Sequence, residues 1–130
     1  MAGDKKPATV LVVDDEAAIR QIERRVLEKA GYAVTEASQG LEAIEMLSGG
    51  APLELLIADL DMPGLSGDEM VTRIRALRPD LRVLYVTGHI DMLMDARQLW
   101  EGESFLEKPF SAAGLLEAAS LLLHGSIAAP

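Results

Sequence analysis

Carboxylate side chains stand at the ends of two apolar, strand-like segments of this sequence. Asp14 and Asp15 directly follow the run at 9–13, and Asp59 ends the run at 53–59. Carboxylates that converge repel one another, so at least one would have a raised pKa unless a cation neutralises the group. Mg²⁺ suits such a place because it takes oxygen ligands and pairs one or two carboxylates with a phosphate group. The acids therefore predict a Mg²⁺ site that handles phosphoryl groups.

A nucleophile and two further anion-binding groups complete this chemistry. A carboxylate can attack phosphorus and carry the group as an aspartyl phosphate, and we assign that role to Asp59. Phosphoryl transfer depends mostly on positioning and charge neutralisation; Lys108 would supply an ammonium and Thr87 a hydroxyl. Singly, each residue has an ordinary explanation: Asp14 as a helix cap, Thr87 in a turn, Lys108 as a solvated lysine. Their occurrence at successive strand ends is what favours a site.

The elements that must position these residues alternate between strands and helices. Strands are expected over 9–13, 33–37, 53–59, 81–88 and 104–106. Five helices are expected. The first three are marked by apolar residues at helical spacing: Ile19, Ile22, Val26 and Ala30; then Leu41, Ile44 and Leu47; then Met70, Ile74 and Leu77. The fourth is expected over 91–100, and the fifth over 111–123 with Leu115, Ala119 and Leu122 inward. Asp14 or Asp15 is expected to cap the first helix, and Ser66 with Glu69 the third. This alternation predicts a doubly wound α/β fold with a parallel sheet, helices on both faces, and ligands outside the carboxyl ends of the strands.

Length and charge narrow the class of protein. The chain has 130 residues and no cysteine, so one domain is expected, with no disulfide framework. The net charge of −9 disfavours direct binding to nucleic acid or anionic membranes. The apolar runs are too short to cross a bilayer, and no signal peptide is visible, so a cytoplasmic location is expected. We expect a flexible lead at 1–7, a domain at 8–123 and a C-terminal tail at 124–130.

Four segments of the chain read, in order, LVVDDE, DLDMPGLSGDEM, VLYVTG and FLEKPF. Together they resemble the receiver domain of two-component response regulators over about residues 8–123. The resemblance implies a flavodoxin-like (CheY-like) fold, whose five parallel strands take the order 2-1-3-4-5. The segment at 89–104 is similar to receivers that are fused to hybrid histidine kinases.

The resemblance also implies roles for the strand-end residues. Asp59 would be the phosphoacceptor. Asp15 and Asp59 would give Mg²⁺ their carboxylates and Asp61 its backbone carbonyl, while Asp14 would act through a bound water. Lys108 would pair with the phosphoryl group.

A conformational switch is implied by the same family. Thr87 would bond the phosphoryl group, and Phe105 would move into the space that Thr87 vacates. The family often has tyrosine at the position of Phe105. The peptide bond between Lys108 and Pro109 is typically cis. His89 lies where a side chain tunes the loss of the phosphoryl group, although an exposed loop histidine is an equally good interpretation.

The predicted function is that of a phosphoryl-accepting signalling switch. Its phosphodonor would be a histidine kinase or a histidine phosphotransfer protein, and it would catalyse only its own phosphorylation and dephosphorylation. The signal would pass to a downstream protein or fused domain through the fourth helix, fifth strand and fifth helix, and a homodimer stays open. Two alternatives remain: a small haloacid-dehalogenase-like phosphatase that uses Asp59 and Asp61, and a protein-binding module that is never phosphorylated.

Overall fold

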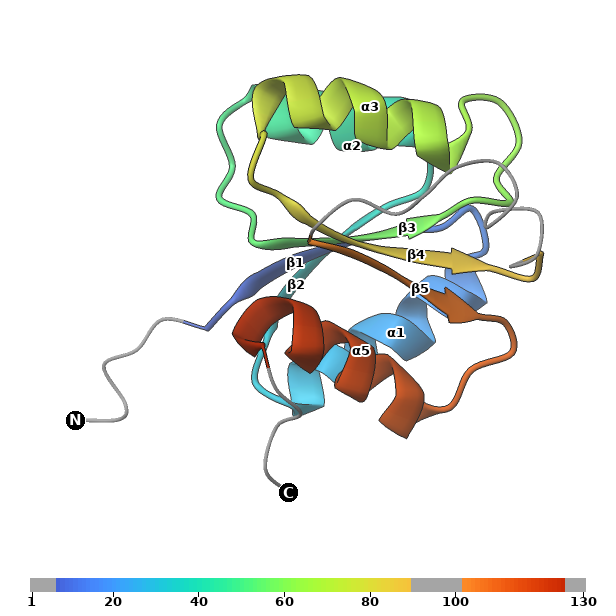
Figure 1. Cartoon of the computed structure of the whole chain (residues 1–130). Helices are drawn as coiled ribbons and strands as arrows, with labels where there is room; N and C mark the ends of the chain where they lie inside the picture. Colours follow the sequence, from blue (N-terminus) through green and yellow to red (C-terminus); the bar gives the residue numbers. More distant parts are fainter. Residues whose placement is uncertain (1–6, 90–101, 126–130) are drawn as a thin grey trace.

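The computed structural model describes residues 7–89 and 102–125 (Figure 1). The strands are β1 (Thr9–Val13), β2 (Ala33–Ala37), β3 (Leu55–Asp59), β4 (Arg82–Thr87) and β5 (Glu103–Glu107). The helices are α1 (Ala17–Lys29), α2 (Gly40–Ser48), α3 (Gly67–Leu77) and α5 (Ala112–His124). All four strand pairs are parallel and the order is β2-β1-β3-β4-β5, which confirms the predicted doubly wound fold.

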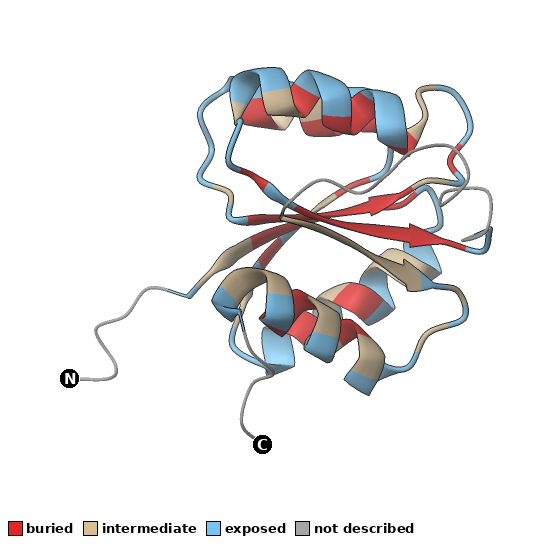
Figure 2. Cartoon of the chain, viewed as in Figure 1, coloured by how far each residue is buried: buried red, intermediate tan, exposed pale blue. Residues whose placement is uncertain are grey.

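The sheet lies between two layers of helices. α2 and α3 cover one face, and α1 and α5 cover the other (Figure 1). Successive side chains of a strand point to opposite faces, so Val10 and Val12 of β1 pack toward α1 and α5, whereas Leu11 and Val13 pack toward α2 and α3. Because both faces are covered, β1, β3 and β4 are apolar along almost their whole length and are buried (Figure 2).

The inward face of α1 differs from the one that its apolar residues predict. Glu23 and Leu27 are buried, whereas Ile22 is 52% exposed and Ala30 is also exposed. Adjacent helical positions are about 100° apart, so Glu23 and Ile22 lie on neighbouring faces of the helix. The face that packs against the core is the one with Glu23 and Leu27. In α3, Met70 and Ile74 are buried as expected, but Leu77 lies in the last turn and is exposed.

The predicted cap is confirmed for α3 and wrong for α1. The Ser66 hydroxyl accepts a hydrogen bond from the Glu69 N–H at 3.1 Å. The residue that precedes α1 is Glu16, whose side chain makes no capping bond. Asp14 instead accepts from the Glu16 N–H at 2.9 Å, two residues along the chain. A short turn of this kind holds the Asp14 carboxylate at the strand end, too early in the chain to cap the helix.

The helix expected over 91–100, most of the expected lead and most of the expected tail lie outside the described residues. Within the described ranges, no helix combines the length and the apolar character that a bilayer crossing requires.

Candidate functional site

Charged and hydroxyl side chains meet at the edge of the sheet where the strands end. Asp14 follows β1, Asp59 ends β3, Thr87 ends β4 and Lys108 follows β5. The arrowheads of β3, β4 and β5 point to this edge in Figure 1. It is the edge at which open parallel sheets bind ligands.

Three carboxylates form the acidic part of the site. Asp14, Asp15 and Asp59 each offer an oxygen, and these oxygens lie within 4.8 Å of one another. Asp14 and Asp59 are only 1% and 2% exposed, whereas Asp15 faces solvent. Burial raises the pKa of Asp14 to about 6, and the neighbouring charge of Asp59 adds to the effect, against a hydrogen bond from the Glu16 backbone and the charge of Lys108.

The donor set fits a hard divalent cation. Asp14 Oδ2 is buried and has no hydrogen-bond partner among the residues that the structure describes. A buried, unpartnered carboxylate oxygen is unfavourable, and a cation that it contacts directly or through water would satisfy it. The remaining donors are oxygens as well, which is the ligand chemistry of Mg²⁺.

Lys108 is paired with Asp59. Its Nζ lies 3.0 Å from Asp59 Oδ1 and 3.9 Å from Asp61 Oδ2. Burial disfavours the ammonium charge, but the hydrogen bond and charge of Asp59, with the charges of Asp14 and Asp61, outweigh burial and raise the pKa of Lys108. The Asp61 N–H also donates to Asp59 Oδ1, at 2.9 Å. Oδ1 receives both donors, and Oδ2 receives neither. The peptide bond from Lys108 to Pro109 is cis.

Thr87 is held by the loop after β3 and by its own loop. Its hydroxyl donates to Asp61 Oδ1 at 3.1 Å, and the N–H of Gly88 donates to Asp61 Oδ2 at 2.9 Å. The N–H of His89 donates to Thr87 Oγ1 at 2.9 Å, and His89 is exposed. Phe105 is half-buried against the core between the sheet and the α2–α3 layer.

Gly67 allows α3 to approach the end of β3. A Cβ at this position would lie 2.5 Å from the backbone oxygen of Asp59. Such contacts with backbone do not occur, so only glycine lets the first turn of α3 close over the loop that carries Asp61. Ser66, one residue earlier, caps the same helix.

Sequence reasoning missed two residues of α1 that act on the acids. Arg20 donates from Nη1 to the backbone oxygen of Asp14 at 2.7 Å and from Nε to Glu36 at 3.2 Å. Glu23 is 1% exposed, and burial, then the charges of Asp14 and Asp59, raise its pKa to about 8. The available signal for Glu23 was its position one turn before Leu27, which places both residues on the same face of the helix. No pattern in the sequence pointed to Arg20.

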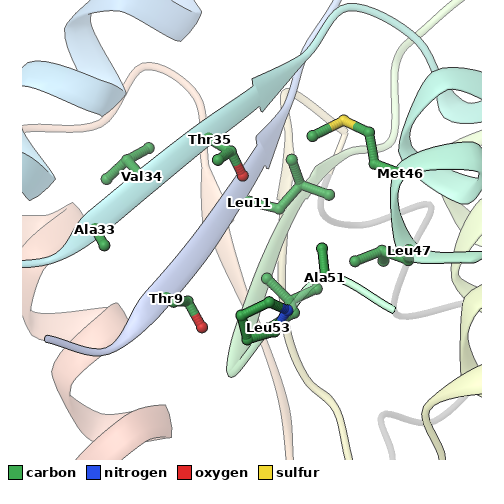
Figure 3. Close-up of a pocket in the computed structure, with 10 residues that line it drawn as sticks. Thr9, Leu11, Ala33, Val34, Thr35, Met46, Leu47, Ala51 and Leu53 are labelled. Carbon is green, nitrogen blue, oxygen red and sulfur yellow. The ribbon is translucent and has the colours of Figure 1, made fainter. Parts of the chain in front are cut away.

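Two hollows differ in their relation to the site. A cavity of about 200 Å³ lies between the sheet and the end of α2 and is lined by Thr9, Leu11 and Leu47 among others (Figure 3). Thr9 begins β1, so this cavity lies away from the acids. A second hollow, of about 310 Å³, is lined by Lys108 itself together with Ile19, Ile22, Pro109 and Phe110.

Comparison with known proteins gives consistent matches. Residues 10–120 match the family model of the response regulator receiver domain. The chain is 34% identical over 120 residues to the sensor kinase CckA of Brucella abortus, which covers 90% of this chain but 13% of that kinase. It is 31% identical over 111 residues to sporulation initiation phosphotransferase F of Bacillus subtilis, which covers 84% of this chain and 88% of that protein.

Solved structures agree with these sequence matches. A response regulator receiver protein from Sinorhizobium medicae superposes with a TM-score of 0.80 at 32% identity, covering 91% of this chain and 95% of that one. The receiver domain of the hybrid histidine kinase CckA gives a TM-score of 0.78 at 30% identity, covering 90% of this chain and all of the other.

Proposed function

The chain belongs to the family of response regulator receiver domains, and we propose that it accepts a phosphoryl group on Asp59 in an Mg²⁺-dependent reaction. Receiver domains are signalling switches, and in response regulators and hybrid kinases they interact with histidine kinases or phosphotransfer proteins. The donor proposed here is therefore the phosphohistidine of a histidine kinase or of a histidine phosphotransfer protein.

The observation that carries the proposal is the pairing of Asp59 with Lys108. Because Lys108 and the Asp61 N–H both bind Oδ1, the carboxylate is fixed with Oδ2 available for attack. Oδ2 forms the bond to phosphorus while the bond from phosphorus to the donor imidazole nitrogen breaks, and that nitrogen keeps the electron pair. Lys108 Nζ lies 3.0 Å from Asp59 Oδ1, so it is placed to receive one phosphoryl oxygen. The hydroxyl of Thr87, at the end of the neighbouring strand β4, is proposed to receive another.

Asp14, Asp15, Asp59 and the backbone carbonyl of Asp61 are the groups proposed to hold Mg²⁺, with Asp14 acting through water. When bound, the cation would neutralise the charge of the acids and of the incoming phosphoryl oxygens. The unpartnered oxygen of Asp14 supports this assignment.

The hollow beside Lys108 is the proposed docking place for the phosphodonor protein. Ile19, Ile22 and Phe110 give it an apolar lining, and it opens next to the ammonium that contacts Asp59. A partner that covers this hollow would bring its histidine to the site and exclude water from the reacting atoms. The output surface expected around the fourth helix includes residues outside the described ranges and stays a prediction, as do the switching role of Phe105 and the tuning role of His89.

Neither alternative is favoured. A phosphatase of the haloacid-dehalogenase type would need the Asp61 carboxylate as acid and base, but both of its oxygens bond to Thr87 and Gly88. A module that is never phosphorylated would not need Asp14, Asp59 and Lys108 assembled at one edge.

The test is incubation with Mg²⁺ and acetyl phosphate, followed by intact-mass measurement. We expect a single phosphoryl adduct that hydroxylamine removes, that Asp59→Asn abolishes and that EDTA prevents. Asp80→Asn is the matched control because Asp80 is exposed in the loop before β4, at the other edge of the sheet. An adduct that persists in Asp59→Asn contradicts the proposal. Steady hydrolysis of a phosphomonoester that Asp61→Asn abolishes would favour the phosphatase.

A further inference from the structure

The carboxylate of Asp61 uses both of its oxygens on donors at the end of β4. Oδ1 accepts from the hydroxyl of Thr87 at 3.1 Å, and Oδ2 accepts from the N–H of Gly88 at 2.9 Å. Lys108 Nζ lies 3.9 Å from Oδ2. The Asp61 carboxylate thus already accepts hydrogen bonds from a hydroxyl and a backbone amide of the site, and it lies near the ammonium of Lys108.

These donors are of the kind that a phosphoryl group on Asp59 needs. Its terminal oxygens require a cation and hydrogen-bond donors, and Thr87 and Lys108 have that role in the proposed function. The side chain of Asp61 and a phosphoryl group are both anions, and they cannot use the same hydroxyl and amide at the same time.

We propose that the Asp61 side chain is an internal competitor of the phosphoryl group, holding Thr87 and Gly88 until phosphorylation displaces it. The inference rests on the proposed function and adds its regulation. Hydrogen bonds to a carboxylate are stronger than neutral ones, so the unphosphorylated arrangement is stabilised by two of them. A phosphoryl group on Asp59 repels the Asp61 carboxylate and takes its donors, and the 30% exposed side chain can turn toward solvent.

Displacement also reaches the loop after β4. Thr87 Oγ1 accepts from the N–H of His89 at 2.9 Å while it donates to Asp61. When the hydroxyl turns from Asp61 to a phosphoryl oxygen, the backbone at 88 and 89 must adjust with it. The Asp61 carboxylate therefore stabilises the unphosphorylated conformation of the loop at 88–89, and its displacement lowers the free-energy cost of rearranging that loop.

The experiment measures binding of beryllium fluoride, a phosphoryl analogue, with Mg²⁺ present, in the wild-type chain, Asp61→Ala, Asp61→Asn and Glu107→Gln. Glu107 is the matched control: it is exposed and lies opposite Thr87 in the β4–β5 register, so its change removes a charge nearby without removing the Asp61 carboxylate. We expect the dissociation constant to fall about tenfold in Asp61→Ala, by less in Asp61→Asn, and to change less than twofold in Glu107→Gln. The Gly88 amide proton should shift in Asp61→Ala before any fluoride is added.

Two results overturn the inference. The first is that Asp61→Ala binds beryllium fluoride no more tightly than the wild type; if the alanine variant does not fold, Asp61→Asn takes its place in this comparison. The other is equal tightening in Glu107→Gln, because general charge removal would then explain the effect. Failure of the proposed function looks different: the wild-type chain and Asp59→Asn would bind beryllium fluoride equally, or neither would bind it.

Discussion

At the scale of single residues, the site holds more acid than its surroundings can keep ionised. Burial raises the pKa of Asp14 to about 6 and that of Glu23 to about 8, and Asp59 adds to both shifts. Lys108 is the cation paired with Asp59, and its own pKa is raised by that pairing in spite of burial. The fold therefore keeps Glu23 protonated near neutral pH. A divalent cation would relieve the charge repulsion between Asp59 and the neighbouring acids.

Glu23→Gln should flatten the dependence of stability on pH. The ordinary pKa of 4.5 rises to about 8 on folding, so the folded chain binds more protons than the unfolded chain between these values. The contribution of Glu23 to the free energy of unfolding is then highest below pH 4.5, falls as the pH rises, and is lowest above about pH 8. Urea unfolding in EDTA at pH 5, 7 and 8.5 should show the wild-type chain losing about 2–4 kcal/mol more than the variant across this range.

Glu45→Gln is the control for this measurement because Glu45 is an exposed acid on α2. It should follow the wild-type curve. If Glu23→Gln does so as well, Glu23 is not held protonated by the fold. Asp14 contributes a loss of the same sign at lower pH, from 3.8 to about 6, in every variant.

At the scale of elements, the strands and their polar ends could be predicted because each strand is a short apolar run that stops abruptly. Parallel pairing then placed Asp14, Asp59, Thr87 and Lys108 at one edge. The orientation of α1 could not be predicted in this way, because a helix buries whichever stripe packs best, and here that stripe includes Glu23. The bond from the Arg20 side chain to the backbone oxygen of Asp14 could not be predicted either, because a contact between a side chain and an irregular backbone segment leaves no periodic trace in a sequence.

Arg20→Met should weaken Mg²⁺ binding about tenfold, since Arg20 holds the backbone of Asp14 and such supporting contacts tune metal sites. Arg24→Met is the matched control, because Arg24 lies one turn further along α1 and also pairs with Glu36, at 2.8 Å. Isothermal titration with Mg²⁺ should separate the two variants. An equal loss in both would assign the effect to the ion pairs with Glu36, and an unchanged affinity in Arg20→Met would remove its positioning role.

Gly67→Ala should lower the free energy of unfolding by about 2 kcal/mol and reduce phosphorylation, because its Cβ would meet the Asp59 backbone at 2.5 Å. Gly114→Ala offers a matched test in the first turn of α5, where the nearest atom to a new Cβ is the Ser111 hydroxyl at 3.3 Å. That variant should be close to neutral in urea unfolding. A neutral Gly67→Ala would mean that α3 can move away from β3 without loss.

At the scale of the whole molecule, two separate cores support one functional edge. One core lies between the sheet and the α2–α3 layer, and the other between the sheet and the α1–α5 layer. Asp14 directly follows β1 and Asp59 is the last residue of β3, and both strands contribute side chains to both cores. The backbone that carries each acid is thus held by packing on both faces of the sheet. We therefore expect the acids to meet only when both layers are assembled, which would couple any ligand of the site to folding of the domain.

Mg²⁺ should accordingly raise the melting temperature of the chain, because a cation that needs the assembled acids binds the folded state and not the unfolded one. At a free concentration ten times its dissociation constant it stabilises by about 1.4 kcal/mol, which corresponds to about 5 °C for a domain of this size. The rise should be largest at pH 7.5 and smaller at pH 5, where protons compete for Asp14. Asp15→Asn should lose most of the rise, whereas Asp80→Asn should keep it. Equal Mg²⁺-induced shifts in these two variants would show that the cation acts on the net charge of −9 as a whole and has no defined site at the strand ends.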